Sequence, residues 1–319
     1  MKILAADIHA ERAELTLLRI SHNGERESLF NAVYQPKKFS SPRRLIEQFL
    51  HDADAKAALI ERFCLSLAGK VDGNHCHLSE LDWDFDAAKL AEHFYISEVS
   101  LISDFDAAAR GVAVTSSEDI VVLNEGAERE RGIRVVTGAG HGLGMTWMDH
   151  PHNAMERHQS KGGHVDFAPV NEEQVAVLEY LMKRFNHVSY ERILSDEGLR
   201  ELYAYCKQEE PGSDARLTVQ QITQRTPDDA AAERAIKLFV TTYGAYVGNL
   251  ALLYQPMGGI YIGGHVAVAL KQWMQSEHFL NTCLKKGRMS NIVKQTPIYL
   301  VTNPGINLQG AIETATYRY

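Results

Sequence analysis

The chain begins MKILAADIHAERAELTLLRI, residues 1–20, and this stretch predicts a β-hairpin almost at the first residue. Two apolar runs, assigned to strands Lys2–Ile8 and Ala13–Ile20, flank a short polar turn. Asp7, at the end of the first strand, is well placed to face a ligand that carries phosphate or a metal ion. Glycines normally let backbone N–H groups approach phosphate closely in such a turn. This turn instead consists of four residues without a glycine: His9, Ala10, Glu11 and Arg12.

Strands and helices alternate outward from the hairpin, which predicts an α/β fold. A third strand is expected over Ser28–Tyr34, and Ser41 followed by Pro42 marks the start of a helix. Later strands are expected within residues 63–69, 98–105 and 258–264, and a strand, a glycine turn and a second strand within 132–148. Later helices are expected within residues 82–94, where an aspartate caps the start, and within 107–114, 171–185, 228–254 and 304–317.

The bulk composition is that of an ordinary globular protein. At 319 residues the chain is long for one core, so two domains are expected. A net charge of −8 and a pI of about 6.0 argue against a nucleic-acid or membrane-surface role. No apolar run approaches about 18 residues and there is no basic, then apolar leader, so the expected location is the cytoplasm. The four cysteines show no paired spacing and are expected to be reduced thiols.

Two histidine-rich stretches raise the question of a metal site. Residues 75–77, His-Cys-His, follow a Gly-Asn pair, and we interpret them as a solvated loop. His150, His152 and His158 have no cysteine or carboxylate partner at helical spacing, which favours an exposed hairpin. Neither stretch is taken as a metal site.

Three glycine-rich turns follow strands: residues 138–144 (GAGHGLG), Gly162-Gly163 and Gly263-Gly264. A dinucleotide-binding fingerprint opens a helix within a βαβ unit. Residues 138–144 lead into another strand instead, and no Walker lysine is present. Two strand–turn–strand phosphate loops, one in each domain, fit the pattern better, as in the actin-like sugar kinases.

The chain resembles the bacterial ATP-dependent glucokinases over essentially its whole length. The resemblance is carried by residues 101–112, 138–144, 162–169 (GGHVDFAP), 187–203 (HVSYERILSDEGLRELY), 258–266 and 303–311. It implies a two-domain actin-like ATPase or sugar kinase fold, ribonuclease H-like, with the sugar in an interdomain cleft. A small α/β domain would span 1–110 and be completed by a C-terminal helix, 303–319; a large α/β domain would span 111–302. A homodimer and a role in bacterial carbohydrate metabolism, in glycolysis, are also implied.

On the sugar side, the resemblance places Asp104 on the family's catalytic base. This residue takes the proton of the sugar's 6-hydroxyl so that the oxygen can attack the γ-phosphorus of ATP. His164 and Glu191 match two sugar-binding residues. Three further sugar-side candidates depart from the family pattern: Ser103 stands for an asparagine, Lys161 for a glutamate, and Glu80 ends a Ser-Glu pair that stands for Thr-Asn. The change to lysine reverses the charge, because an ammonium can only donate hydrogen bonds.

The first phosphate loop departs further. Asp7 keeps the position that would organise Mg²⁺, but His9 and Ala10 replace bare glycines and Glu11 replaces a threonine. Two unit charges 4 Å apart interact by about 1 kcal/mol in water and by several times more in a partly dry cleft. A glutamate here would therefore repel the phosphates of ATP, although Arg12 is a candidate substitute donor.

The second phosphate loop is better preserved. It retains Gly138, Gly140 and Gly142 but has His141 where the family has threonine, and the adenosine-side turn Gly263-Gly264 looks intact. The structural alternative for residues 138–144 is a tight hairpin that binds no phosphate.

Four of the sugar-side candidates also have a purely structural interpretation. Asp104 could be the N-cap of the following helix, and His164 a structural histidine. Glu191 could pair with its neighbour Arg192 or with a helix N-terminus. Lys161 is either solvated or part of an ion pair across the cleft with one of two acids, Glu11 or Asp104.

Two functional hypotheses remain open at this point. In the first, which the altered loops favour, phosphoryl transfer is lost or very weak, no cofactor is needed, and the protein acts in sugar binding or regulation with an unidentified protein partner. In the second, the protein is an active glucokinase that uses ATP and Mg²⁺ to make glucose 6-phosphate and ADP, or a kinase with altered sugar specificity.

Overall fold

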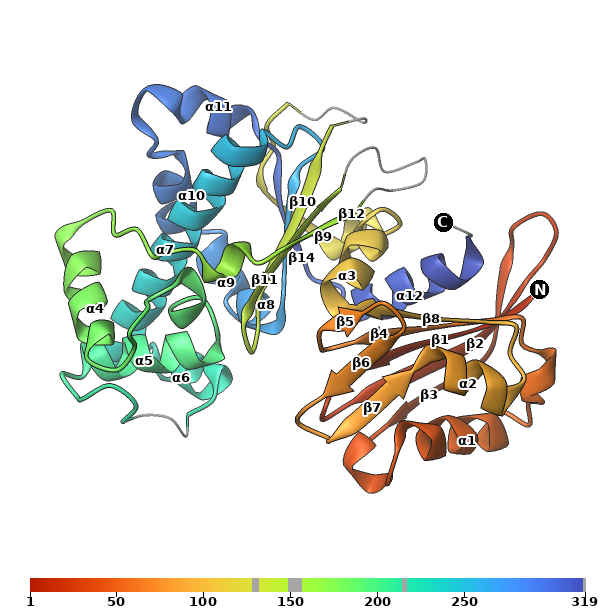
Figure 1. The fold of residues 1–319 in the computed structure, drawn as a ribbon. Coiled ribbons are helices and arrows are strands. Elements are labelled where there is room, and N and C mark those ends of the chain that lie inside the picture. Colours follow the sequence, from red (N-terminus) through yellow and green to blue (C-terminus); the bar gives the residue numbers. More distant parts are fainter. Residues whose placement is uncertain (128–131, 149–156, 214–216, 318–319) are drawn as a thin grey trace. The chain divides into compact units, whose positions relative to one another are not determined.

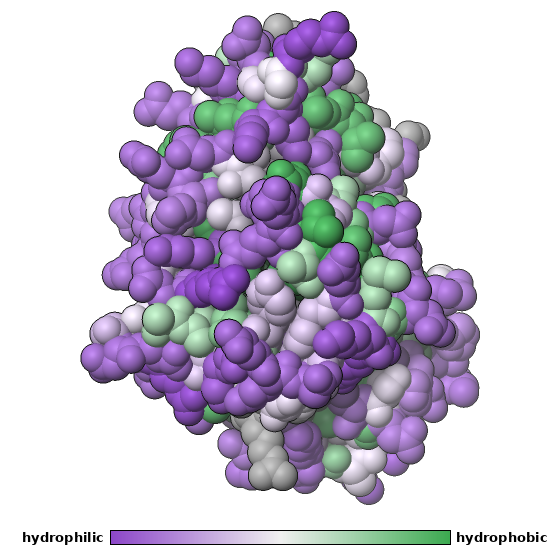
Figure 2. All heavy atoms as spheres, turned by 90° about the vertical axis from the view of Figure 1, so that its left-hand side faces the viewer, coloured by the Kyte–Doolittle hydropathy of each residue, from purple (hydrophilic) through white to green (hydrophobic). Residues whose placement is uncertain are grey.

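The computed structural model describes residues 1–127, 132–148, 157–213 and 217–317. It divides into two compact units. Unit 1 comprises Met1–Thr115 and Asn303–Tyr319, and unit 2 comprises Ser116–Thr302. Both units are mixtures of helices and strands (Figure 1), so the predicted α/β class is confirmed. The face in Figure 2 is mostly hydrophilic, with apolar side chains in small patches.

Unit 1 is built on a five-stranded sheet in the order β3-β2-β1-β4-β8. Its strands are β1 Lys2–Ile8, β2 Ala13–Ile20, β3 Arg26–Tyr34, β4 Arg62–Leu67 and β8 Glu98–Ser103. The first three form an antiparallel meander, whereas β1, β4 and β8 run parallel. The predicted hairpin is therefore confirmed, and the carboxyl ends of β1, β4 and β8 share one edge of the sheet.

Both faces of this sheet are covered, because successive side chains of a strand point to opposite sides. Leu4 and Ala6 of β1 pack in a core that includes α1 Pro42–Asp52 and α2 Ala87–Phe94. Ile3 and Ala5 face the other way, into a core with α3 Asp104–Val112 and α12 Ile306–Thr316. Figure 1 shows α3 and α12 on the opposite side of the sheet from α1 and α2. A small sheet adjoins the first core: β5 Val71–Asp72, β6 His75–Leu78 and β7 Trp83–Asp86.

Helices α3 and α12 approach each other at glycines. A Cβ on Gly310 of α12 would overlap the backbone oxygen of Ala107 in α3, and a Cβ on Gly111 would overlap that of Ile306. These glycines let the last helix of the chain lie directly on the helix that carries Asp104.

Unit 2 contains a six-stranded sheet in the order β12-β11-β10-β13-β14-β9. The strands are β9 Ile120–Asn124, β10 Arg134–Ala139, β11 Leu143–Met148, β12 Arg157–Ser160, β13 Ile260–Gly263 and β14 Ile298–Val301. The helices are α4 Glu172–Met182, α5 Asp196–Cys206, α6 Val219–Arg225, α7 Ala230–Tyr254, α8 His265–Ala269, α9 Lys271–Met274, α10 Glu277–Leu284 and α11 Ser290–Gln295. Of these, α7 is long and apolar enough to cross a membrane by length and composition, but 72% of its apolar window is buried inside the protein, as in a core helix.

Two local predictions are wrong. Within residues 82–94, Trp83–Asp86 is strand β7, and the helix begins only at Ala87 with Asp86 as its N-cap. The stretch His75–His77 is part of strand β6 rather than a loop: Cys76 points into the core, while the histidines on either side are exposed.

The predicted hairpin around the second histidine-rich stretch is tested only in part. His150 and His152 lie outside the described residues. His158 belongs to β12, which pairs with β11, and its ring stacks on Trp147 with 3.8 Å between ring centroids. This histidine is partly buried.

Candidate active site

The first loop of unit 1 is a tight turn in which the His9 N–H donates to the Arg12 carbonyl at 2.9 Å. Its two long charged side chains have partners within the same unit. The carboxylate of Glu11 pairs with Lys37, and the guanidinium of Arg12 donates to Glu14 at 2.6 Å. The negative charge expected to repel phosphate is therefore balanced locally, and the arginine that could replace a phosphate donor is already engaged.

Asp7 is held from two sides inside the sheet. The Ser66 hydroxyl, on the adjacent strand β4, donates to Asp7 Oδ1 at 2.8 Å, and His9 Nε2 lies 3.2 Å from Asp7 Oδ2. Burial opposes protonation of this imidazole, but the hydrogen bond to Asp7 and the negative charges of Asp7 and Asp104 outweigh it and raise the pKa of His9. The histidine that stands in a glycine position thus bonds the carboxylate expected to organise a metal ion.

Asp104 is the first residue of α3, directly after β8, and it is not the N-cap. The cap is Ser103, whose backbone is extended (φ −70°, ψ 157°) and whose hydroxyl accepts from the Asp106 N–H at 3.1 Å. The capping alternative for Asp104 is therefore wrong. Its own carboxylate accepts from the Phe105 N–H at 2.9 Å.

The environment of Asp104 suits a proton acceptor. Burial raises the pKa of this carboxyl to about 6, and the nearby charges of Asp7 and Asp106 act in the same direction, against the opposing charge of His9. A base works best when its pKa lies near the working pH. Glu80 is exposed and lies in the turn between β6 and β7.

In unit 2, two glycine turns lie against each other. β10 and β11 form the predicted strand–turn–strand, and β10 also pairs in parallel with β13, with Gly138 opposite Gly263. A Cβ on Gly138 would come within 3.1 Å of the Gly263 backbone. Gly264 has a φ of +87°, and a Cβ there would overlap the Ala139 backbone. Bare backbones are thus required where the two turns meet.

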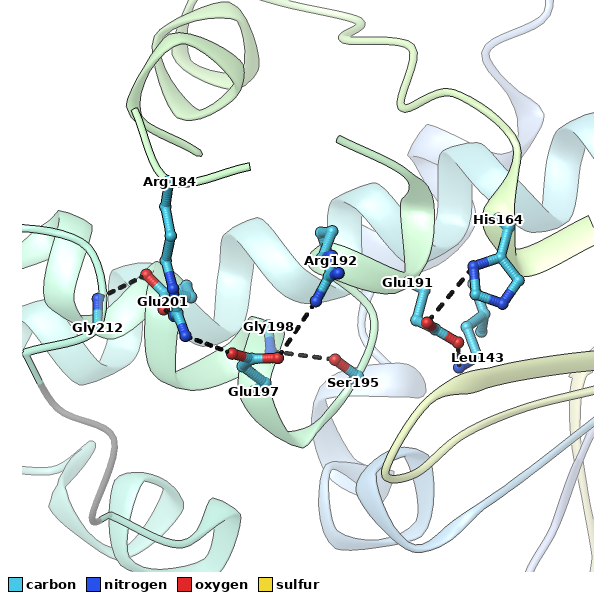
Figure 3. Close-up of polar contacts among 10 residues, drawn as sticks. All are labelled: Leu143, His164, Arg184, Glu191, Arg192, Ser195, Glu197, Gly198, Glu201 and Gly212. Carbon is cyan, nitrogen blue, oxygen red and sulfur yellow. Dashed lines mark hydrogen bonds and ion pairs between the residues drawn. The ribbon is translucent and has the colours of Figure 1, made fainter. Parts of the chain in front are cut away.

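Glu191 joins the tip of this hairpin to the loop of His164 (Figure 3). Glu191 Oε2 accepts from the Leu143 N–H at 3.0 Å, and Oε1 lies 3.6 Å from His164 Nδ1. The absence of a side chain at Gly142 makes room for this carboxylate, because a Cβ there would lie 2.6 Å from Oε2. The structure thus brings His164 and Glu191, two of the three sugar-side candidates of unit 2, together with the glycine hairpin.

The alternative pairing of Glu191 with its neighbour is wrong. Arg192 points to Glu197, with 3.5 Å between Nη1 and Oε2, and the same glutamate pairs with Arg184 at 2.8 Å (Figure 3).

Lys161 directly precedes the short turn Gly162–His164, and its carbonyl accepts from the His164 N–H at 2.9 Å. It is exposed and lines a cavity of about 380 Å³ whose other walls include Tyr246, Asn249 and Leu250. Neither His164 nor Glu191 lines that cavity. The Lys161 side chain thus borders a cavity that the other two sugar-side candidates of unit 2 do not line.

Sequence reasoning missed two side chains beside His141. Asp196, in the first turn of α5, lies 3.0 Å from His141 Nδ1 through Oδ2 and 2.8 Å from His265 Nε2 through Oδ1. The carboxylate thus connects the two glycine turns. No local pattern reveals this, because the three residues come from three segments distant in the chain.

Comparison with known proteins agrees with these motifs. The family model described as "Glucokinase" matches residues 4–317. The chain belongs to the glucokinase family. A glucokinase of Trichormus variabilis is 30% identical over 333 residues, covering 97% of each protein. A crystal structure of glucokinase from an Antarctic psychrotroph superimposes with a TM-score of 0.86 at 27% identity, covering 98% of each chain.

The family assignment also confirms the predicted fold. A ROK-family glucokinase from Streptomyces griseus, solved with glucose and AMPPNP, has a TM-score of 0.62, covers 99% of each chain and is 17% identical, a likeness that shows the fold alone. The actin-like sugar kinase fold expected from the sequence is therefore present, and members of the glucokinase family use ATP.

The residues present leave room for a nucleotide in unit 2, but in unit 1 the carboxylate that could bind magnesium already has a hydrogen-bond partner. A Cβ on Gly263 would meet nothing within 4 Å, so the turn at the end of β13 leaves open space. Mg²⁺ is commonly held by one or two carboxylates together with substrate phosphates, and Asp7 supplies such an oxygen. His9 competes for that oxygen. A magnesium ion in unit 1 would thus share the Asp7 carboxylate with His9 and Ser66 or displace them.

Proposed function

We propose that the protein is an ATP-dependent hexose kinase that transfers the γ-phosphoryl group to the 6-hydroxyl of glucose or a closely related sugar. The single observation that carries this proposal is the environment of Asp104, whose pKa is raised to about 6 at the helix start where the family has its base. Substrates of this class are supported by the glucose and AMPPNP complex of the S. griseus protein.

In the proposed mechanism, Asp104 accepts the proton of the sugar hydroxyl as the oxygen attacks the γ-phosphorus. The bond between that phosphorus and the β,γ-bridging oxygen breaks, and ADP leaves. His164 and Glu191 would hold and orient the sugar, since the carboxylate of Glu191 is itself fixed by the Leu143 N–H. Magnesium, when bound, supplies charge neutralisation on the phosphates. Phosphoryl transfer depends mainly on such positioning and charge balance.

A second candidate is a sugar-binding protein that no longer transfers phosphate. It is favoured by one observation: His9, where the family has glycine, is hydrogen-bonded to the carboxylate that would organise magnesium. The balancing of Glu11 by Lys37 weakens this candidate, because it removes part of the expected repulsion.

A coupled assay over a panel of hexoses with ATP separates the two candidates. The kinase proposal expects turnover with at least one hexose and a loss of about 10²–10⁴-fold in Asp104→Asn, the range for removal of a positioned base. Complete inactivity of the wild-type chain over the panel would contradict it. A variant with the family's loop, His9→Gly/Ala10→Gly/Glu11→Thr, should then be tested; activity gained only there would establish the second candidate.

Cytoplasmic location and a homodimer remain proposals that rest on the family. The oligomeric state can be checked by light scattering of the purified protein.

A further inference from the structure

Three side chains in unit 2 form a compact ionisable cluster that the sugar chemistry does not use. Asp196 Oδ2 lies 3.0 Å from His141 Nδ1, and Asp196 Oδ1 lies 2.8 Å from His265 Nε2. The two imidazole rings lie 5.3 Å apart between centroids. His141 is at the tip of the β10–β11 hairpin and His265 begins α8, so each glycine turn contributes one histidine.

The hydrogen bonds to Asp196 dictate what each ring offers to a ligand. In a neutral imidazole one nitrogen donates and the other accepts. Because Asp196 accepts at Nδ1 of His141 and at Nε2 of His265, the opposite nitrogens carry lone pairs while the rings are neutral. Those nitrogens repel phosphate oxygens. After protonation both nitrogens of a ring donate, and the opposite nitrogens become anion-binding groups.

The cluster is accessible and its charge depends on these histidines. The side chains of His141 and His265 are 78% and 54% exposed. With both rings neutral the cluster has a charge of −1, and with both protonated it has a charge of +1. Histidine is the side chain whose charge ordinarily changes between about pH 5 and 8.

The charged groups around the cluster are largely balanced by one another. A cavity of about 230 Å³ is lined by His141, Arg184, Asp196, Glu197, Arg200 and Glu201. Arg184 pairs with both glutamates, and Glu197 also contacts Arg192. Arg200 donates to the Leu217 carbonyl.

The Asp196 carboxylate is ionised at neutral pH, because its pKa is lowered. Burial tends to raise its pKa, but the hydrogen bond from His265 and the charges of His265, His141 and Arg200 outweigh burial and lower it. The carboxylate is thus available to stabilise protonated imidazoles.

We propose that His141 and His265, held by Asp196, form a proton-coupled site for the polyphosphate tail of a nucleotide. The site takes up protons from solvent as the nucleotide binds. This inference rests on the proposed kinase function, in that it requires a nucleotide at the glycine turns of unit 2. It gives His141, which stands where the family has threonine, a role in recognising phosphate.

Calorimetry of the full-length protein with MgATP tests the proposal. Titrations at pH 7.5 in buffers of different ionisation enthalpy give the number of protons taken up, from the slope of the observed enthalpy. We expect about one to two protons per nucleotide, and a Kd that rises about tenfold per pH unit for each proton taken up.

Asparagine is a suitable replacement for histidine because its amide can still donate to Asp196.

His141→Asn and His265→Asn should each reduce proton uptake, and the double variant should abolish it, while glucose affinity and the thermal midpoint stay unchanged. His187→Asn is the matched control, because His187 forms a similar pair with Asp166 at 2.7 Å in the same unit. Uptake in the control should equal that of the wild type.

Failure of the proton-coupled site can be distinguished from failure of the kinase proposal. Nucleotide binding without proton uptake, or equal uptake in the double variant, would overturn this inference and leave the kinase proposal standing. No MgATP binding by the wild-type chain would overturn both.

Discussion

Replacing Gly142 by alanine should displace the Glu191 carboxylate while leaving residue 191 a glutamate. The added Cβ would lie 2.6 Å from Glu191 Oε2, which is nearer than real Cβ contacts occur. Because the carboxylate is the far end of a flexible side chain, it is expected to turn away from the Leu143 N–H, from which it now accepts at 3.0 Å. A hydrogen bond to a charged group contributes about 1.5–3 kcal/mol. At roughly 2–4 °C per kcal/mol for a unit of this size, the thermal midpoint of unit 2 should fall by about 3–12 °C.

The same change should weaken sugar binding, because Glu191 can no longer present its second oxygen beside His164. Each 1.4 kcal/mol is a factor of ten in Kd, so we expect glucose affinity to fall about tenfold or more. Calorimetry with glucose measures the affinity, and scanning calorimetry measures the midpoint.

A double-mutant cycle isolates the contact. In a Glu191→Ala background there is no carboxylate to displace, so the Gly142→Ala change should cost less than about 0.5 kcal/mol. An equal loss of stability in both backgrounds would refute the reasoning, because the damage would then come from the hairpin backbone itself.

Three further predictions concern other contacts. Because the folded-state pKa of Asp104 is about 6, above its unfolded value of about 3.9, its charged form opposes folding: stability is lost as the pH rises from about 4 to 6. Asp104→Asn should therefore stabilise unit 1 by about 2–3 kcal/mol at pH 7 and have no effect below about pH 4 in denaturant titrations; equal effects at both pH values would contradict the shift. Gly310→Ala should destabilise unit 1 by roughly 3 kcal/mol, since its Cβ would overlap the Ala107 carbonyl, and unchanged denaturation would refute the close helix contact. Arg184→Ala should destabilise unit 2 by about 2–4 kcal/mol by leaving the buried Glu201 carboxylate without its cation, and adding Glu201→Gln should recover part of that loss, measured in the same titrations.

The fold could be predicted well where the information is local. β1 and β2 match the predicted bounds of the opening hairpin, and α1 begins at Pro42 after a Ser41 cap. The error at 82–94 has a local cause as well. The alternation Trp-Asp-Phe-Asp at 83–86 has the period of a strand, yet the apolar residues after it have helical spacing.

The candidate site was less predictable because its partners are distant in sequence. Ser103 and Asp104 are both good capping residues, and only the extended backbone at Ser103 decides between them. Glu11 was expected to repel phosphate, but the sequence could not show that Lys37 neutralises it. The sharing of Asp196 by His141 and His265 required the tertiary structure in the same way.

The central claim is most directly tested by following phosphoryl transfer itself. Phosphorus NMR of the protein with MgATP and glucose should show the signals of ATP giving way to those of glucose 6-phosphate and ADP, with a rate that rises with pH to a plateau above about pH 6, where Asp104 is ionised. In Asp104→Asn the transfer should be at least about a hundredfold slower. Equal rates in the two proteins, or no sugar phosphate from the wild-type chain, would contradict the account.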